Sequence, residues 1–472
     1  MSFILFFLAC NAPDSISNGD DHPVYSPVHP VIIIGGGASG ISTAIRLLEL
    51  DIEPLILEKE SVLGGAGIHA GRFFAVNTPW QIDQGIIDSP TTAITEWEDF
   101  TGSVPDDQVE HFITESASIL EWITSYDISF SSVQPDIGAG SVPRLHALSP
   151  DTPHPLALWS ELLSPYAKHN QTVTALEKQE NVFIVTTENN VYYADNVVIA
   201  TGGFARNETI VSESLPEIDN YNWHMEAWFG MVGDAIPWLT ELSVPLQNMK
   251  HIGLYAHGVT DVNLGTPEIM VIPALERSLI LNQDGERPFN EQYTQSLRSG
   301  QFMLEHQRLF AIFDQPLWEG TFFQGMGYNY TTPPILTSTQ YAEVTGLTAY
   351  PELRDLAQDL NLDVNTTLNT VSTYNTGIQQ GSDALGKDIS RLPPLQTPPF
   401  YAVELQLSTG KSFGGATVNQ MGETIIEGLY TVGESAGFLG TPQVGWGFSG
   451  SITACYYLGK QTAEQIAETY SE

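Results

Sequence analysis

Apolar and polar positions are arranged most regularly between Val31 and Glu60. The apolar run Val31–Ile34 predicts a strand buried on both faces, because such strands have few polar positions. An amphipathic pattern then continues to about Leu50 and predicts a helix. The apolar run Pro54–Leu57 predicts a second buried strand. Strand, helix and strand in this order predict a βαβ unit of a parallel sheet.

Glycines occupy the turn between the first strand and the helix of this unit. Gly35, Gly37 and Gly40 form the pattern G-x-G-x-x-G. Gly35 allows a tight turn, Gly37 lets a pyrophosphate approach the backbone, and Gly40 lets helix and strand pack closely. Free N–H groups at the helix start favour the pyrophosphate. Glu58 ends the second strand and is placed to accept a hydrogen bond from an adenosine ribose, so the unit predicts a dinucleotide site.

The rest of the chain divides into two kinds of pattern. Helical patterns and an antiparallel hairpin precede a buried strand that runs into a glycine turn; they lie at Thr91–Phe100, Asp106–Tyr126, Pro155–His169, Val182–Ala194 and Asn196–Phe204. The stretch 252–408 lacks βαβ rhythm and is rich in aromatic residues and proline. Strand, glycine and helix return afterwards. We therefore expect 31–251 and 409–472 to form one domain, with 252–408 inserted into it.

The composition excludes some classes of partner. Among 472 residues, 56 are acidic and 17 basic, which gives a net charge of −39. A field of this sign repels nucleic acid and anionic membrane surfaces, so no nucleic-acid partner is expected. The two cysteines, Cys10 and Cys455, cannot form a disulfide framework or a cysteine-based metal centre. We expect no metal, and we expect Cys455 to be a core thiol.

The first ten residues, MSFILFFLAC, resemble the lipobox of bacterial lipoproteins. Residues 1–10 then form a lipoprotein-type signal, and the polar, proline-rich residues 11–30 form a tether. The apolar run is too short to span a bilayer, so we expect a lipid anchor at Cys10 rather than a transmembrane helix. The expected location is the cell envelope, on the exported side. The run lacks the basic residues with which such signals usually begin. The alternative therefore stays open that it is a frayed apolar terminus of a cytoplasmic protein.

Several motifs in order give the chain a family resemblance. These are GGGASG with LEKE, GGAGIHAGRFFA, QIDQGIIDSP, ADNVVIATGGFARN, LILNQDGERPFNE, GLYTVGESAG and GWGFSGSITACYYLGK. Together they resemble the fumarate reductase/succinate dehydrogenase flavoprotein family, which includes 3-ketosteroid dehydrogenase-like and urocanate reductase-like members. The resemblance implies an α/β fold, in which a Rossmann-like FAD-binding domain has a parallel sheet with an added antiparallel layer. It also implies an inserted α+β capping domain.

The resemblance further implies the cofactor and its contacts. FAD is expected to be non-covalent, because His69 lies a few residues away from the position of the histidine that links flavin in some members. His146, in VPRLHAL, matches a family position near the flavin edge. The implied cofactor contacts are Gly35, Gly37, Ala38, Ser39, Gly40, Glu58, Lys59, Gly64, Gly65, Gly71, Ala200, Thr201, Gly202, Gly433, Glu434, Ser449 and Ile452.

The chain departs from the family at the positions that bind a dicarboxylate. Where fumarate reductases carry a histidine and two arginines, this sequence has Gly410, Gln295 and Trp446. Desolvating two carboxylates without paired donors is costly, so we expect the substrate not to be a dicarboxylate. A small molecule is reduced or oxidised across a C=C or CH–CH bond, with hydride passing to or from flavin N5. The candidate catalytic residues are Tyr255, Tyr401, Lys411 and Arg298.

Two other functions stay open at this point. The missing basic cluster is also compatible with a flavoprotein that has a degenerate active site and only passes electrons to a partner. An amine- or alcohol-oxidising flavoenzyme shares the FAD domain, but the capping motif LILNQDGERPFNE disfavours it.

Overall fold

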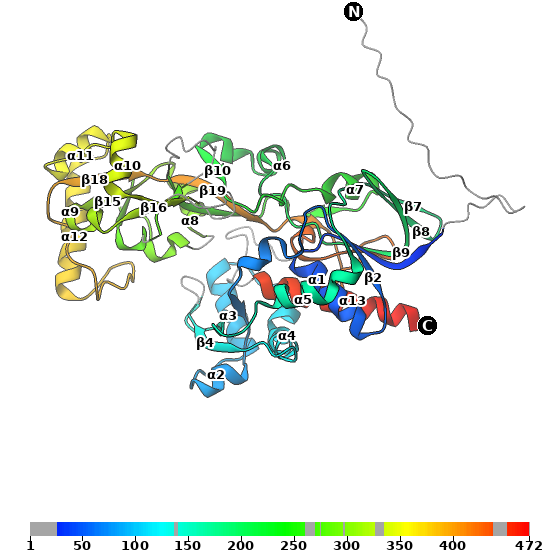
Figure 1. Ribbon diagram of the computed structural model, residues 1–472. Coiled ribbons are helices and arrows are strands. Elements are labelled where there is room, and N and C mark those ends of the chain that lie inside the picture. The colour runs from blue at the N-terminus through cyan, green and yellow to red at the C-terminus, as the bar shows by residue number, and fades with distance from the viewer. Residues whose placement is uncertain are drawn as a thin grey trace, which may run out of the picture.

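The computed structural model describes residues 26–135, 140–259, 270–273, 275–295, 298–325, 335–437 and 451–471 (Figure 1). The predicted signal with Cys10 and nearly all of the predicted tether lie outside the described residues, as do Trp446 and Ser449. Within the described part of the chain, no helix is long and apolar enough to cross a membrane.

A seven-stranded sheet forms the centre of the first body. Its strands run in the order β6-β2-β1-β9-β8-β7, and β21 also pairs with β9. β1, β2, β6, β9 and β21 are parallel, whereas β7, β8 and the first part of β9 form an antiparallel layer. The strands are β1 (Val28–Ile34), β2 (Pro54–Leu57), β6 (Ala167–Lys168), β7 (Val173–Gln179), β8 (Val182–Thr187), β9 (Val191–Ile199) and β21 (Leu429–Thr431).

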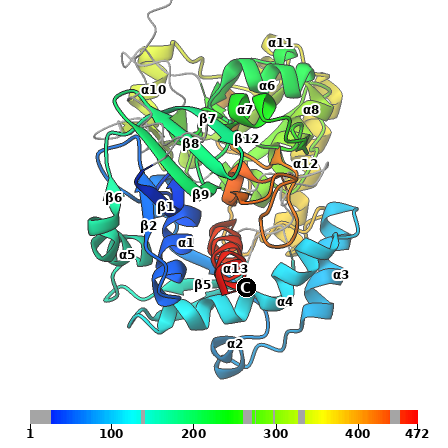
Figure 2. The same cartoon turned by 90° about the vertical axis from the view of Figure 1, so that its right-hand side faces the viewer.

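Helices from distant parts of the sequence cover this sheet. α1 and α13 pack side by side against it, and α4 lies next to α13 (Figure 2). The helices cross closely because Gly459 of α13 has no side chain: a Cβ there would come within 2.2 Å of Ser42 Oγ. The helices are α1 (Ala38–Glu49), α2 (Pro79–Asp83), α3 (Pro90–Thr101), α4 (Asp107–Thr124), α5 (Pro155–Leu163), α7 (Ala235–Glu241) and α13 (Ser451–Ser471).

A small three-stranded antiparallel sheet flanks the helices, in the order β3-β5-β4. Its strands are β3 (Arg72–Phe74), β4 (Phe130–Gln134) and β5 (Leu145–Leu148). The helix predicted over Pro155–His169 is too long, because α5 ends at Leu163 and Ala167–Lys168 instead forms β6 beside β2. Pro165 lies in the short 3-10 turn between them and cannot continue the α-helical hydrogen bonding.

The second body has its own core and two sheets. One sheet has the order β10-β19-β12-β13-β16-β17 and the other the order β14-β15-β18. Their strands are β10 (Trp223–Met225), β12 (Ile252–Val259), β13 (Met270–Val271), β14 (Leu279–Asn282), β15 (Leu309–Asp314), β16 (Phe322–Gly325), β17 (Ile335–Thr337), β18 (Phe400–Glu404) and β19 (Gln406–Ser412). The helices are α6 (Glu208–Ser214), α8 (Arg298–His306), α9 (Gln315–Glu319), α10 (Ser338–Thr345), α11 (Leu353–Asp359) and α12 (Val364–Gln380).

The strands that connect the two bodies position the site described below. β10 joins the sheet of the second body, although the chain afterwards returns to the first core through Trp238 and Leu239 of α7. β19 begins in the second core and ends at Ser412, whose hydroxyl accepts a hydrogen bond from Phe204 N. A short pair, β11 (Leu246–Gln247) with β20 (Gly415–Ala416), follows on the side of the first body. The fold class predicted from the sequence is confirmed.

Candidate cofactor and active site

A cavity of about 840 Å³ lies at the carboxyl ends of the parallel strands. Its walls come from the turn between β1 and α1, the end of β2, the 3-10 turn Gly65–His69, and the end of β9. The loop 228–234, β19, the turn Gly433–Ser435 and the start of α13 complete it. Ligands of open α/β sheets bind at this edge, because helix starts and loops converge there.

The glycine turn forms one wall, and each glycine has a distinct steric reason. Gly35 has φ +102°, and a Cβ there would lie 2.5 Å from the carbonyl oxygen of Ala200. A Cβ on Gly40 would lie 2.1 Å from Gly35 O. No atom of the described residues lies within 4 Å of a Cβ added at Gly37, and Gly37 caps α1 without a side-chain hydrogen bond. The open space and the uncapped helix start fit the pyrophosphate of a dinucleotide.

Glu58 is fixed by backbone donors at the same edge. Its carboxylate accepts hydrogen bonds from Gly36 N at 2.6 Å and Glu60 N at 2.8 Å, and the residue is 8% exposed. A carboxylate has about four acceptor positions, so two bonds leave capacity for a ribose hydroxyl. This geometry fits the role expected for Glu58.

Lys59 ties a loop across the cavity. Its Nζ donates to Asp234 Oδ2 at 2.6 Å and to the carbonyl of Gly230 at 3.1 Å. On the same loop, Trp228 packs against His69, with ring centroids 5.2 Å apart. Lys59 therefore lines the cavity, but its ammonium already donates to Asp234 and Gly230. A cofactor would contact either the methylene groups of its side chain or the remaining N–H of the ammonium.

The opposite end of the cavity contains an unsatisfied acid. Burial raises the pKa of Glu434 to about 7, although the nearby Lys411 ammonium opposes the shift. Among the described residues, Glu434 Oε2 is buried and has no hydrogen-bond partner, whereas Lys411 Nζ donates to Ser451 Oγ at 2.8 Å. Burial also raises the pKa of the Cys455 thiol to about 12, so this thiol stays neutral. A buried unpaired oxygen facing a cavity fits a ligand hydroxyl, such as those of the FAD ribityl chain.

Strand β19 contains a one-residue bulge at Gly410. Gly253 of β12 lies opposite Lys411, and the next residue, Leu254, lies opposite Thr409, so Gly410 is the extra residue. A bulge re-aims the side chain beside it. Lys411 consequently projects from the same face as Gly253, which regular alternation along β19 would not have produced.

Tyr255 lies on this same face, two residues after Gly253. Its ring covers Gly410, where an added Cβ would come within 2.4 Å of the Tyr255 ring. A histidine at position 410 is therefore incompatible with this position of Tyr255. The bulge brings Tyr255 and Lys411 to one face; Lys411 is among the residues that line the cavity, and Tyr255 is not.

Most of the cofactor contacts expected from the sequence line the cavity: Gly35, Gly37, Ala38, Ser39, Glu58, Lys59, Gly65, Gly71, Ala200, Thr201, Gly202, Glu434 and Ile452. Gly40 lies in the first turn of α1, and Gly64 and Gly433 lie at the starts of two 3-10 turns; Gly64 N donates to Gly36 O at 2.8 Å. No sequence motif selects Gln171, Trp228 or Asp234, which also line the cavity. Gln171 lies between β6 and β7, Trp228 follows β10, and Asp234 directly precedes α7.

Two predicted catalytic residues lie elsewhere or are only partly described. Tyr401 is not in the cavity wall: its hydroxyl donates to Gln315 Oε1 at 2.8 Å, and its ring stacks on Trp318 at 4.6 Å within the second core. These contacts assign Tyr401 to packing. Arg298 begins α8, which packs on β12, and the structure describes only its backbone.

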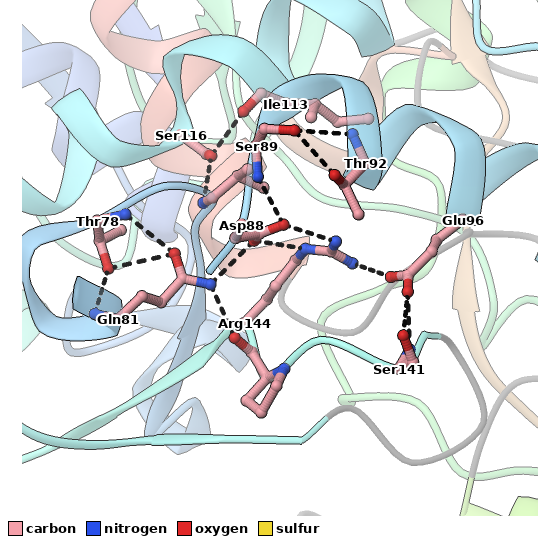
Figure 3. Close-up of polar contacts among 12 residues, drawn as sticks. Thr78, Gln81, Asp88, Ser89, Thr92, Glu96, Ile113, Ser116, Ser141 and Arg144 are labelled. Carbon is pink, nitrogen blue, oxygen red and sulfur yellow. Dashed lines mark hydrogen bonds and ion pairs between the residues drawn. The ribbon is translucent and has the colours of Figure 1, made fainter. Parts of the chain in front are cut away.

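His146 lies behind the cavity in a closed polar network. Its Nε2 is 2.7 Å from Thr78 Oγ1, and burial lowers its pKa to about 4. Next to it, the buried Arg144 makes two hydrogen bonds of 2.9 Å to Asp88 and one of 2.5 Å to Glu96 (Figure 3). The neighbouring Ala147 lines the cavity, whereas His146 does not. His146 is thus a neutral structural histidine of this network.

An α/β fold with a glycine turn, an uncapped helix start and a cavity along parallel strand ends fits a dinucleotide-binding fold. The chain belongs to the FAD-binding domain family, and the match to this family covers residues 30–447. It is an FAD-dependent oxidoreductase, and the predicted resemblance and cofactor are confirmed.

Three relatives illustrate the range of this similarity. The chain is 23% identical over 445 residues to the NADH:fumarate oxidoreductase of Klebsiella pneumoniae (strain 342); the match covers 87% of this chain and 44% of that protein. It is 23% identical to the vinyl phenol reductase of Lactiplantibacillus plantarum (strain ATCC BAA-793 / NCIMB 8826 / WCFS1), covering 93% of this chain and 96% of that protein. The structure of 3-ketosteroid-delta4-(5alpha)-dehydrogenase from Rhodococcus jostii RHA1 matches with TM-score 0.74 and 21% identity, covering 96% and 100% of the two chains.

Proposed function

We propose that this chain transfers a hydride between FAD and a C=C or CH–CH bond of a neutral or mono-anionic substrate, and that dicarboxylates are not its substrates. The observation that carries the proposal is the Tyr255 ring over Gly410. The position that would supply a histidine to a substrate carboxylate is occupied by the face of a phenol. An aromatic ring favours an apolar or aromatic substrate group over a second carboxylate.

The two residues on this face have separable roles in reduction of a C=C bond. FAD held along this cavity, with Gly37, Glu58 and Glu434 among its contacts, would in its reduced form provide the hydride for one carbon of the substrate. The Tyr255 hydroxyl donates the proton to the neighbouring carbon and is reprotonated from water. The Lys411 ammonium stabilises negative charge that develops on the substrate carbonyl or arene. The reverse reaction uses the same groups with the proton moving to Tyr255.

The names of the relatives cover both substrate classes, because several of them are fumarate reductases, including the fumarate reductase (cytochrome) of Shewanella frigidimarina, of which the match covers 77%. The vinyl phenol reductase is named for an uncharged aromatic alkene, and the 3-ketosteroid dehydrogenase for a neutral ketone. The NADH:fumarate oxidoreductase is named for a dicarboxylate, but this chain spans less than half of its length. Non-covalent FAD belongs to the same proposal, since His69 packs against Trp228 at the cavity wall.

Anaerobic turnover with reduced viologen tests the proposal. We expect measurable reduction of neutral aromatic alkenes or enones, and negligible reduction of fumarate. Tyr255→Phe is expected to lower kcat by about 100-fold or more while FAD content stays unchanged, because the phenol hydroxyl alone is removed. Fumarate turnover near ~10 s⁻¹, a typical enzyme value, would refute the substrate class. No turnover with any substrate, together with fast electron exchange with a redox protein, would favour the electron-transfer alternative.

A further inference from the structure

A buried carboxylate–histidine pair lies beneath the proposed proton donor. Glu226 follows β10 and is 6% exposed, and His257 of β12 is 5% exposed. His257 Nε2 is 2.7 Å from Glu226 Oε2, and Ser408 Oγ donates to the same oxygen at 2.6 Å. Three strands of one sheet, β10, β12 and β19, therefore converge on a single carboxylate oxygen.

The protonation of this pair follows from its contacts. Burial raises the pKa of Glu226, but the charge and hydrogen bond of His257 and the hydrogen bond of Ser408 outweigh burial and lower it overall. An ionised carboxylate only accepts hydrogen bonds. His257 must therefore carry a proton on Nε2 and donate it to Glu226, which fixes the plane of the imidazole ring.

The imidazole in turn holds the Tyr255 ring. Tyr255 and His257 are two residues apart on β12, in a stretch where the register with β19 shifts. Their rings stack with centroids 4.7 Å apart and planes within 6° of parallel. Gly410 supports the same phenol ring, since an added Cβ there would come within 2.4 Å of it. His257 and the bulge at Gly410 are thus two features that hold the phenol ring in this position.

The pair is also connected to the cofactor loop. The backbone N–H groups of Glu226 and Ala227 both donate to Thr409 O, at 3.0 and 2.9 Å. Trp228, which follows directly, lines the cofactor cavity. Glu226 therefore lies where the second sheet, the phenol and the cavity wall meet.

We infer that Glu226 and His257 are positioning residues that hold the Tyr255 hydroxyl in line with the reacting carbon. This inference rests on the proposed function, because it assigns the two residues a role only through Tyr255. Neither residue lines the cavity, and their effect is geometric: a displacement of about 1 Å of a catalytic group costs about 100-fold in rate.

A double-mutant cycle tests the inference. Glu226→Ala and His257→Ala are each expected to lower kcat by about 10- to 100-fold while KM changes by less than about threefold. Glu226→Gln retains an acceptor for Nε2–H and is expected to recover much of the activity. In a Tyr255→Phe background, both substitutions should have no further effect, because the group that they position is gone.

Control measurements separate positioning from folding. Ser408→Ala removes only one hydrogen bond to Glu226, so it is the variant to use if the alanine variants lose FAD or unfold; it should lower kcat by about two- to fivefold. His111→Ala is the matched control. His111 Nδ1 is 2.6 Å from Tyr457 Oη, and this second histidine–tyrosine pair lies outside the cavity wall, so kcat should not change.

The variants test the positioning role of Glu226 and His257 separately from the proton-donor role of Tyr255. Undiminished losses from Glu226→Ala and His257→Ala in the Tyr255→Phe background would overturn the positioning role. Unchanged kcat in Ser408→Ala and in both alanine variants would also overturn it. Full activity of Tyr255→Phe alone would instead overturn the role of Tyr255 in the proposed function, and the two failures are therefore distinguishable.

Discussion

The cofactor cavity and the network around Arg144 are both buried and polar, but they differ in how their polar groups are paired. In the cavity, α1 begins without a side-chain cap, and Glu434 Oε2 has no hydrogen-bond partner within the part of the chain that the structure describes. In the network, Arg144 is bonded to Asp88 and Glu96, and Ser141 also donates to Glu96 (Figure 3). Unpaired buried groups are costly unless a ligand pairs them, so the cavity is a binding site and the network is structural.

This difference separates residues that the sequence motifs treat alike. The motif QIDQGIIDSP resembles a family pattern as well as GLYTVGESAG does. In the structure, Gln81 and Asp88 of the first motif donate to and accept from residues of the network. Glu434 of the second motif faces the cavity. Similarity to the family marks both motifs in the same way. Only the hydrogen-bond pairing of their side-chain atoms shows which motif faces a ligand site.

The largest expected effect comes from breaking the network. Arg144→Met leaves the Asp88 carboxylate buried without its partner, and the free energy of unfolding should fall by about 3–5 kcal/mol. Urea unfolding of the apoprotein measures this. Arg308→Met is the matched control, because its pair with Glu404 is 43% and 47% exposed and should contribute at most about 1 kcal/mol. Similar losses in both variants would contradict the structural role of the network.

Opening or filling the cavity should affect binding rather than folding. Gly37→Val places a side chain in the space expected for the pyrophosphate, so FAD affinity should fall by about 100-fold, or about 2.7 kcal/mol. The free energy of unfolding of the apoprotein should stay unchanged, since no atom of residues with a described position lies within 4 Å of the new Cβ. Flavin released by acid precipitation measures the bound FAD, and flavin retained in the pellet would contradict non-covalent binding.

Gly40→Ala is the matched change at a packed glycine. Its Cβ would lie 2.1 Å from Gly35 O, so this variant should lose stability even without FAD. A Gly37→Val protein that binds FAD normally would show that the cavity end beside α1 does not hold the pyrophosphate.

The smallest expected effect is a pH dependence with opposite signs in the two regions. Burial raises the pKa of Glu434 from 4.5 to about 7, so its stabilising contribution is present below pH 4.5 and is lost as the pH rises to 7. Burial lowers the pKa of His146 from 6.5 to about 4, so its contribution is present above pH 6.5 and is lost as the pH falls to 4.

Urea unfolding of the apoprotein across this pH range measures both slopes. Glu434→Gln should remove a decrease of about 1–2 kcal/mol between pH 4.5 and 7, a discounted value because Glu434 is partly exposed. His146→Gln should instead remove the fall in the free energy of unfolding between pH 6.5 and 4. If Glu434→Gln does not change how the free energy of unfolding varies between pH 4.5 and 7, Glu434 is already paired in the apoprotein. In that case the cavity does not differ from the Arg144 network at this residue.

Local chemistry made the first wall of the site predictable. The unit from Val31 to Glu58 was correctly predicted from the sequence, because a strand, a turn that needs glycines and an amphipathic helix are determined by residues close together in the chain. The hairpin of β8 and β9 was predicted for the same reason. The end of α5 was not, since Ala167–Lys168 forms a strand only because β2 lies beside it.

The chemistry at the far end of the cavity was decided by tertiary structure alone. Tyr255 and Tyr401 are alike in sequence, yet one lies over Gly410 and the other stacks on Trp318. Lys411 shares a face with Tyr255 only because β19 has a bulge. The sequence by itself determined that the chain binds a dinucleotide and has two bodies. Which polar side chains meet, and which stay unpaired, depends on contacts between residues far apart in the chain, and no local pattern contains that information.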